Sequence, residues 1–182
     1  MGLVHLYYGE GKGKSTAAAG LMLRALGAGY DVTIVRLLKG GEPESGEVKL
    51  LEKNGARVIN GKPENGFASR LDEEGKQRLK LFQDGILKEV LKEFRFPVRE
   101  DTNEGQEKML VLDEALAACE MGLTDEELVR ELVREGRKQA EIVLTGRNPR
   151  EWMIKEADYI TRFKAERHPY EKGITARKGI EY

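Results

Sequence analysis

The sequence predicts an α/β fold built on a mainly parallel central sheet flanked by helices. Short apolar runs of strand length recur along the chain, and segments of helical composition separate them. The expected strands are residues 3–8, 32–38, 57–60, 109–112, 141–144 and 159–163. The expected helices are residues 15–28, 47–54, 72–94 and 124–138. Strands that alternate with helices form parallel sheets, because each helix carries the chain back across a face of the sheet.

Local signals mark the ends and the buried faces of these helices. After the first helix, Gly27 and Gly29 supply residues that tolerate positive φ. Before the last helix, Thr124 and Glu127 have the spacing of a capping box. Apolar residues recur at helical spacing in the segment 72–94 and are expected to face the core. They are Leu79, Phe82, Ile86, Leu87, Val90, Leu91 and Phe94.

The composition indicates one protein domain, residues 1–182, with no repeat and no second unit. With 31 basic and 32 acidic residues, the net charge of −1 gives no broad attraction to nucleic acid or to a membrane, so neither is expected as a partner. The single cysteine, Cys119, excludes an internal disulfide and is interpreted as a small apolar core residue. No N-terminal apolar run resembles a signal peptide or a membrane span, which predicts a cytoplasmic protein.

The first apolar run leads directly into a glycine- and lysine-rich loop, and helix-forming residues follow it. Backbone amides of such a loop converge on phosphate oxygens, and the helix N-terminus adds partial positive charge. The expected phosphate ligands are Gly9, Gly11, Lys12, Gly13, Lys14, Ser15 and Thr16. The strict phosphate-loop pattern has glycine where Tyr8 stands, so the loop is a variant. The alternative is a turn that merely joins a strand to a helix; strand, Gly-Lys-Ser triplet and helix together favour a P-loop NTPase-like (RecA-like) fold.

Two neighbouring carboxylates, Asp113 and Glu114, follow the apolar run 109–112. Ligands bind at the carboxyl ends of parallel strands. Because Mg²⁺ or Mn²⁺ prefers oxygen ligands and bridges substrate phosphates, Ser15 with one of these acids is the expected metal set. The residues leave open which carboxylate binds the metal. The alternative role of either acid is to cap a helix that begins near Ala115.

Several segments, in order and spacing, resemble the bacterial ATP:corrinoid adenosyltransferases, a family with a P-loop fold, over nearly the whole chain. These segments are residues 9–16, 35–40, 66–67, 111–114, 144–147 and the ending 168–182. The family's phosphate loop also lacks the usual first glycine. The ending, from HPY at 168–170 to KGIEY at 178–182, is the most specific part of the match.

The resemblance implies transfer of the 5′-deoxyadenosyl group of ATP to the reduced cobalt of a corrinoid such as cobalamin, with release of inorganic triphosphate. Since cobalt supplies the nucleophile, the protein aligns it with C5′, excludes water and stabilises the leaving triphosphate. Lys14 is then the expected catalytic residue, with Lys12, the loop amides and the metal beside it. Arg147 is a further expected phosphate contact.

The resemblance also implies an aromatic pair below the corrin ring, which helps to displace the lower axial ligand of cobalt. Phe67 matches the first member and is expected to be catalytic in this sense. Ser69 stands where the family usually has tryptophan, so either another residue shapes the site or a different corrinoid is preferred. A flavoprotein reductase as electron donor and a homodimer are implied as partners. The natural corrinoid, and a role in biosynthesis or in salvage, stay open.

Two other functions are compatible with a phosphate loop. A P-loop ATPase or kinase would transfer a phosphoryl group, using a general base or an arginine finger that the sequence does not single out. A nucleotide-bound switch or corrinoid carrier would bind without turnover. The three differ in their products: triphosphate with adenosylated corrinoid, diphosphate or phosphate, or none.

Overall fold

A computed structural model describes residues 1–40, 45–62, 68–95 and 107–181 of the chain, apart from the side chains of Ser69 and Tyr170. Within these ranges six strands form one sheet in the order β3-β2-β4-β5-β1-β6. The strands are β1 (Val4–Tyr8), β2 (Asp31–Arg36), β3 (Arg57–Asn60), β4 (Lys108–Asp113), β5 (Ala140–Gly146) and β6 (Tyr159–Arg162). Every pairing between neighbouring strands is parallel, which confirms the predicted fold class.

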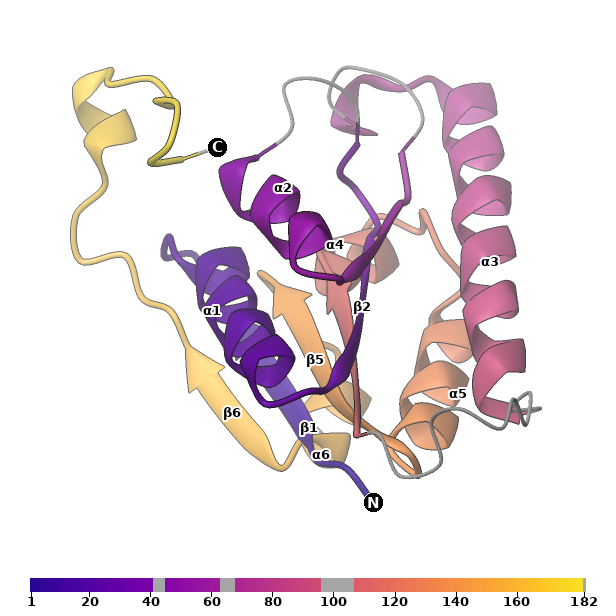
Figure 1. The fold of residues 1–182 in the computed structure, drawn as a ribbon. Helices are drawn as coiled ribbons and strands as arrows, with labels where there is room; N and C mark the ends of the chain where they lie inside the picture. Colours follow the sequence, from indigo (N-terminus) through magenta and orange to yellow (C-terminus); the bar gives the residue numbers. More distant parts are fainter. Residues whose placement is uncertain (41–44, 63–67, 96–106, 182) are drawn as a thin grey trace.

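Helices cover both faces of this sheet. They are α1 (Lys14–Gly27), α2 (Gly46–Lys53), α3 (Glu73–Arg95), α4 (Ala115–Glu120), α5 (Glu126–Gly136) and α6 (Glu151–Glu156), with short 3₁₀ helices η1 (Ala68–Arg70) and η2 (Pro169–Lys172). Figure 1 shows α1 and α2 over one face and α3 and α5 over the other. The list of expected helices does not include α6, and α4 enters the sequence analysis only as the helix near Ala115 that an acid could cap. Six residues make less than two turns, too few for an apolar period to emerge.

The central strand β4 explains why the chain reads as alternating apolar runs and amphipathic helices. Leu110 and Leu112 belong to the core cluster on the α3 and α5 side, whereas Met109 and Val111 belong to the cluster on the α1 and α2 side. Both faces of the strand are therefore buried, as expected of a parallel sheet. Cys119 lies in the first cluster, as interpreted from the sequence, and burial raises the pKa of its thiol to about 12.

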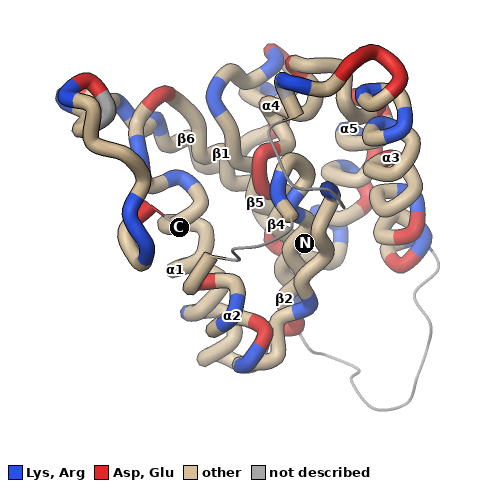
Figure 2. Tube along the Cα trace, turned by 90° about the horizontal axis from the view of Figure 1, so that it is seen from above, with Lys and Arg blue, Asp and Glu red and all other residues tan. Residues whose placement is uncertain are grey.

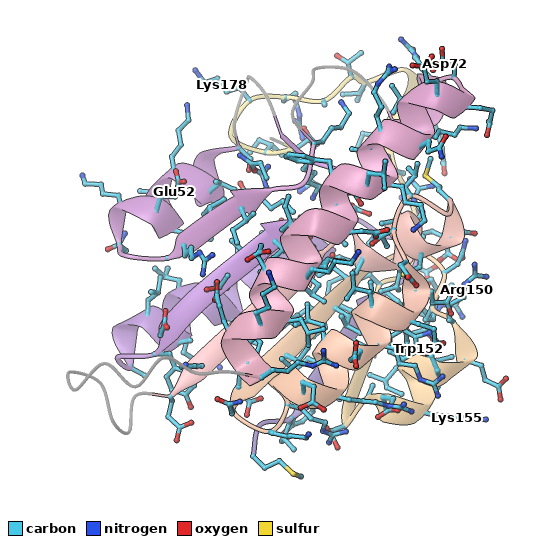
Figure 3. The ribbon with its side chains drawn as sticks, turned by 90° about the vertical axis from the view of Figure 1, so that its right-hand side faces the viewer. Glu52, Asp72, Arg150, Trp152, Lys155 and Lys178 are labelled. Carbon is cyan, nitrogen blue, oxygen red and sulfur yellow. The ribbon has the colours of Figure 1, made fainter. Side chains whose placement is uncertain are left out.

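The structure corrects two details of the predicted helices. Thr124 is not the cap of α5: the N-cap is Asp125, whose carboxylate accepts a hydrogen bond from the amide of Glu127 at 3.0 Å. The Thr124 hydroxyl instead donates to Asp84 at 2.9 Å and so joins α5 to α3. Phe82 does not face the core but is 43% exposed, because it lies at the margin of the apolar stripe of α3. Figure 3 shows this long helix, which begins just after Asp72, lying diagonally across its face of the molecule.

Acidic and basic positions are interspersed along the described trace (Figure 2). Within the same ranges, no helix combines the length and the apolar character needed to cross a bilayer.

Candidate functional site

The candidate site lies at the edge of the sheet toward which all six strands point. Register brings its components together there: Tyr8 at the end of β1 pairs with Gly146 of β5, and Arg36 of β2 pairs with Asp113 of β4. Strand β5 lies between the strand that enters the glycine-rich loop and the strand that carries the acids. The loops that follow β1, β2, β4 and β5 therefore share one edge, the expected place for a ligand in a parallel sheet.

The glycine-rich loop enters helix α1 through a left-handed residue. Gly13, the N-cap of α1, has φ +110, and Gly9 has φ +115, a conformation that favours glycine at both positions. No side chain caps the N-terminus of α1, and its first turn contains no acidic residue. Such a helix end presents amide donors and the positive end of the helix dipole, so it is suited to an anion.

The first half of the loop is held by the backbone that follows β6. The Gly11 amide donates to the carbonyl of Phe163 at 2.8 Å. A Cβ at Gly9 would lie 2.4 Å from that carbonyl oxygen, and one at Gly11 would lie 2.8 Å from the Phe163 carbonyl carbon. These two glycines are thus required by a close crossing of protein backbone. The sequence predicted them as phosphate ligands, and the amide of Gly11 is already used by Phe163.

Lys14 lies at the start of α1 and folds back over the loop. Its ammonium donates to the Gly11 carbonyl at 2.8 Å. Burial lowers the pKa of Lys14, the nearby Glu114 raises it, and the charges of Arg147 and Lys39 lower it further. The structure therefore brings the charges of Arg147 and Glu114 near the Lys14 ammonium. Lys12 and Thr16, in contrast, have exposed side chains.

Asp113 is the centre of a buried hydrogen-bond network. Its Oδ1 accepts hydrogen bonds from the hydroxyl of Ser15 at 2.8 Å and from that of Thr145 at 2.7 Å, and its Oδ2 accepts one from the Lys39 ammonium at 2.8 Å. Burial by itself raises the pKa of this carboxyl, but Lys39, Thr145 and Ser15 together hold it below its usual value. Asp113 is therefore a buried carboxylate at neutral pH, and its charge is balanced by Lys39.

Glu114 has a different position from its neighbour. Its φ is +61, the only positive value among non-glycine residues in the described ranges, and its amide donates to the Thr145 hydroxyl at 2.9 Å. It is the N-cap of α4 by position, yet its side chain makes no capping hydrogen bond. The carboxylate lies 3.7 Å from the Lys39 ammonium instead. The alternative interpretation of Glu114, a capping side chain for the helix near Ala115, is therefore wrong.

Two residues of this network were not predicted as site residues. Lys39 donates to the hydroxyl of Ser15 at 2.9 Å as well as to Asp113, and Thr145 joins Asp113 to Glu114. Lys39 comes shortly after β2, and Thr145 lies near the end of β5. Their position at the carboxyl ends of parallel strands was the one signal in the sequence that could have indicated them. Of the remaining predicted residues, Phe67 lies outside the described residues. Ser69 lies in η1, and its side chain is outside the described part.

The fold and this edge define a P-loop nucleotide-binding protein: a glycine-rich loop leads from a parallel strand into a helix, and its serine is bonded to the aspartate of a nearby strand. The model of the family described as ATP:corrinoid adenosyltransferase BtuR/CobO/CobP matches residues 1–182. The chain belongs to this family, whose activity is the transfer of the adenosyl group of ATP to a corrinoid.

Individual relatives agree with the family match over the full chain. A corrinoid adenosyltransferase of Sinorhizobium sp is 30% identical over 183 residues, which cover 100% of this chain and 80% of that protein. One from Pseudomonas aeruginosa is 29% identical over 181 residues, with 100% of this chain and 84% of the relative covered. One from Escherichia coli K12 is 27% identical over 183 residues, covering 100% of this chain and 86% of the relative.

Proposed function

We propose that the edge described above holds the triphosphate of ATP as a leaving group while the reduced cobalt of a corrinoid attacks C5′. The electron pair of cobalt forms the carbon–cobalt bond. The bond between C5′ and its oxygen breaks, and that oxygen leaves on inorganic triphosphate. The reaction is an alkyl transfer, so the protein has to position and stabilise charge rather than remove a proton.

One observation supports this role above the others. Lys14 begins α1, and Lys39 and Arg147 lie in the loops that follow β2 and β5, yet the charges of Lys39 and Arg147 lower the pKa of Lys14. Like charges held together are unfavourable unless an anion compensates them. Glu114 and Asp113 balance part of this charge. A triphosphate bound at the N-terminus of α1 would balance the rest, with Lys14 as the residue that stabilises the leaving group and Lys12 and Arg147 as further contacts.

Ser15, Asp113 and Glu114 are the proposed ligands of Mg²⁺ or Mn²⁺. Their oxygens already stabilise a cation, since the Lys39 ammonium lies 2.9 Å from Ser15 Oγ, 2.8 Å from Asp113 Oδ2 and 3.7 Å from Glu114 Oε1. Of the two carboxylates, Asp113 is the better candidate for a metal ligand, because the Ser15 hydroxyl donates its proton to Asp113. The Ser15 oxygen thereby keeps a lone pair that can bind the metal. When bound, the divalent cation would neutralise charge on the triphosphate.

Phe67 is proposed, from the family resemblance, to help displace the lower axial ligand of cobalt. Substitution of Phe67 by alanine should slow the reaction that starts from cob(II)alamin more than the reaction that starts from chemically prereduced cob(I)alamin. Both rates are measured under anaerobic conditions by the visible spectrum. Equal losses from the two starting states would remove this role.

The wider setting is proposed from the same resemblance. The whole chain 1–182 acts as one domain in the cytoplasm, as a homodimer, and receives electrons from a flavoprotein reductase. Sedimentation of the purified protein tests the homodimer directly, and a single sedimenting species of monomer mass would contradict it.

An anaerobic assay with ATP, Mg²⁺ and cob(I)alamin tests the reaction itself. The visible spectrum follows the corrinoid, and ³¹P NMR identifies the phosphate product. Adenosylcobalamin with an equal amount of triphosphate is the expected result. Diphosphate or orthophosphate would indicate an ATPase or kinase, and ATP binding without any product would indicate a carrier.

A further inference from the structure

We propose that Lys39 occupies the position of the divalent cation in the nucleotide-free protein, so that the metal enters together with the polyphosphate and not before it. This inference rests on the proposed metal site at Ser15 and Asp113. It assigns Lys39 two positions: on the metal ligands in the absence of nucleotide, and on the triphosphate when the metal has displaced it.

The backbone around Lys39 is fixed close to the acidic strand. The Leu37 amide donates to the Asp113 carbonyl at 3.0 Å, so the turn after β2 continues the pairing of β2 with β4. From the other side, the side-chain amide of Gln83 in α3 donates to the Leu37 carbonyl at 2.6 Å, and Gln83 is fully buried. The turn thus holds Lys39 within reach of the site, while its side chain is 33% exposed and has room to move.

The ammonium and a divalent cation need the same oxygens. Lys39 donates to Ser15 Oγ and Asp113 Oδ2, and these are the two proposed ligand groups with the shortest distances to it. Both cations cannot occupy this position together. Asp113, whose side chain is only 4% exposed, needs a compensating charge in either state, since an unpaired buried carboxylate is costly. Lys39 supplies that charge when no metal is present.

Arrival of nucleotide changes the balance in favour of the metal. A polyphosphate gives Mg²⁺ further oxygen ligands that it lacks when alone. The same polyphosphate offers new acceptors to the three donors of the displaced Lys39 ammonium. Neither gain exists for a metal ion that binds by itself. The metal therefore binds weakly to the free protein and tightly in the presence of ATP or triphosphate.

The test is Mn²⁺ binding to the nucleotide-free protein, followed by the EPR signal of free Mn²⁺, in the wild type and in Lys39→Met. Loss of the charge-assisted contacts of Lys39 should raise Mn²⁺ affinity by about 10- to 100-fold. Lys39→Arg keeps a positive charge and should not raise it. Arg147→Met removes one charge from the same edge without freeing Asp113, and it should raise affinity by less than about threefold.

A second measurement separates displacement from simple repulsion. Calorimetric binding of inorganic triphosphate with Mg²⁺ should be about 10-fold weaker in Lys39→Met than in the wild type, because the displaced ammonium is missing from the triphosphate. Unchanged or lower Mn²⁺ affinity in a folded Lys39→Met protein, or unchanged triphosphate affinity, overturns the inference. If the wild type still makes triphosphate and adenosylated corrinoid, only the inference fails. If the wild type makes no triphosphate, the proposed function fails first.

Discussion

Ser15 and Asp113 are joined by a 2.8 Å hydrogen bond although 98 positions separate them in the chain. Thr145, from β5, donates to the same carboxylate oxygen at 2.7 Å. The phosphate loop, the acidic strand and the strand between them therefore meet at one oxygen atom. The site exists only when the sheet is assembled, and each of its residues can be tested separately.

Asp113→Asn should lower the rate of adenosyl transfer at subsaturating Mg²⁺ by about 10- to 100-fold. An asparagine keeps the shape of the side chain but loses the negative charge that faces Lys39. Its amide NH₂ group is a donor and would face one of the three donors that now bind Asp113, from Ser15, Lys39 and Thr145. The measurement is the Mg²⁺ dependence of the rate. Asp125→Asn is the matched control, because asparagine caps a helix as well as aspartate does. Equal Mg²⁺ dependence of both variants would contradict a metal role for Asp113.

Lys14→Ala should reduce turnover by at least about 100-fold and leave the protein folded. The lysine ammonium donates to the loop carbonyl of Gly11, and the residue is absent from the core clusters. Turnover and the circular dichroism melting curve are measured on the same preparation. Lys49→Ala, which removes an exposed lysine of α2, serves as the control. Full activity of Lys14→Ala would sink the assignment of the loop.

Gly11→Ala should destabilise the nucleotide-free protein by about 1 to 3 kcal/mol. The added Cβ would meet the backbone of Phe163 and Lys164 at 2.8 to 2.9 Å. Gly20→Ala in α1 is the opposite case. Apart from its chain neighbours and the adjacent backbone of its own helix, no atom lies within 4 Å of the place a Cβ would take, so alanine should stabilise the helix by about 0.5 to 1 kcal/mol. Urea unfolding of both variants gives the comparison, and equal stability would show that the crossing does not require glycine.

Protonation of Asp84 should lower the stability of the folded protein as the solution becomes acidic. Burial alone raises the pKa of Asp84, but hydrogen bonds from Lys80, the Asp125 amide and Thr124 hold it below its usual value. The unfolded chain therefore binds the proton more readily. The stabilisation is present above the unfolded pKa of about 3.9 and is lost as pH falls through the lower folded value.

The corresponding measurement is urea unfolding of the wild type and Asp84→Asn over this range of pH. The variant should be less stable by about 1 to 2 kcal/mol at neutral pH, and this difference should shrink below about pH 3.9. Asp31→Asn, at an exposed position of β2, should change stability by less than about 0.5 kcal/mol throughout. A constant difference between wild type and Asp84→Asn would show that the Asp84 charge is not responsible.

Sequence patterns were sufficient where the signal is local. Alternating apolar runs predicted the parallel sheet, and the Gly-Lys-Ser triplet after β1 predicted the loop. Contacts made across the sheet could not be foreseen in the same way. Lys39 reaches Asp113 because β2 pairs with β4 in one register. Residue 11 must be glycine, without a side chain, because the backbone of Phe163 crosses it closely. Both facts depend on which strands are neighbours, and strand order is not written in any single segment.

Cleavage of the bond between C5′ and its oxygen separates adenosyl transfer from phosphoryl transfer, and an isotope reports it directly. ATP labelled with ¹⁸O at the 5′ oxygen is mixed anaerobically with cob(I)alamin and the protein for a single turnover, and the products are weighed by mass spectrometry. We expect all of the label to leave with triphosphate and adenosylcobalamin to carry none. Label retained on the nucleoside, with a shorter phosphate as the second product, would contradict adenosyl transfer and indicate phosphoryl transfer.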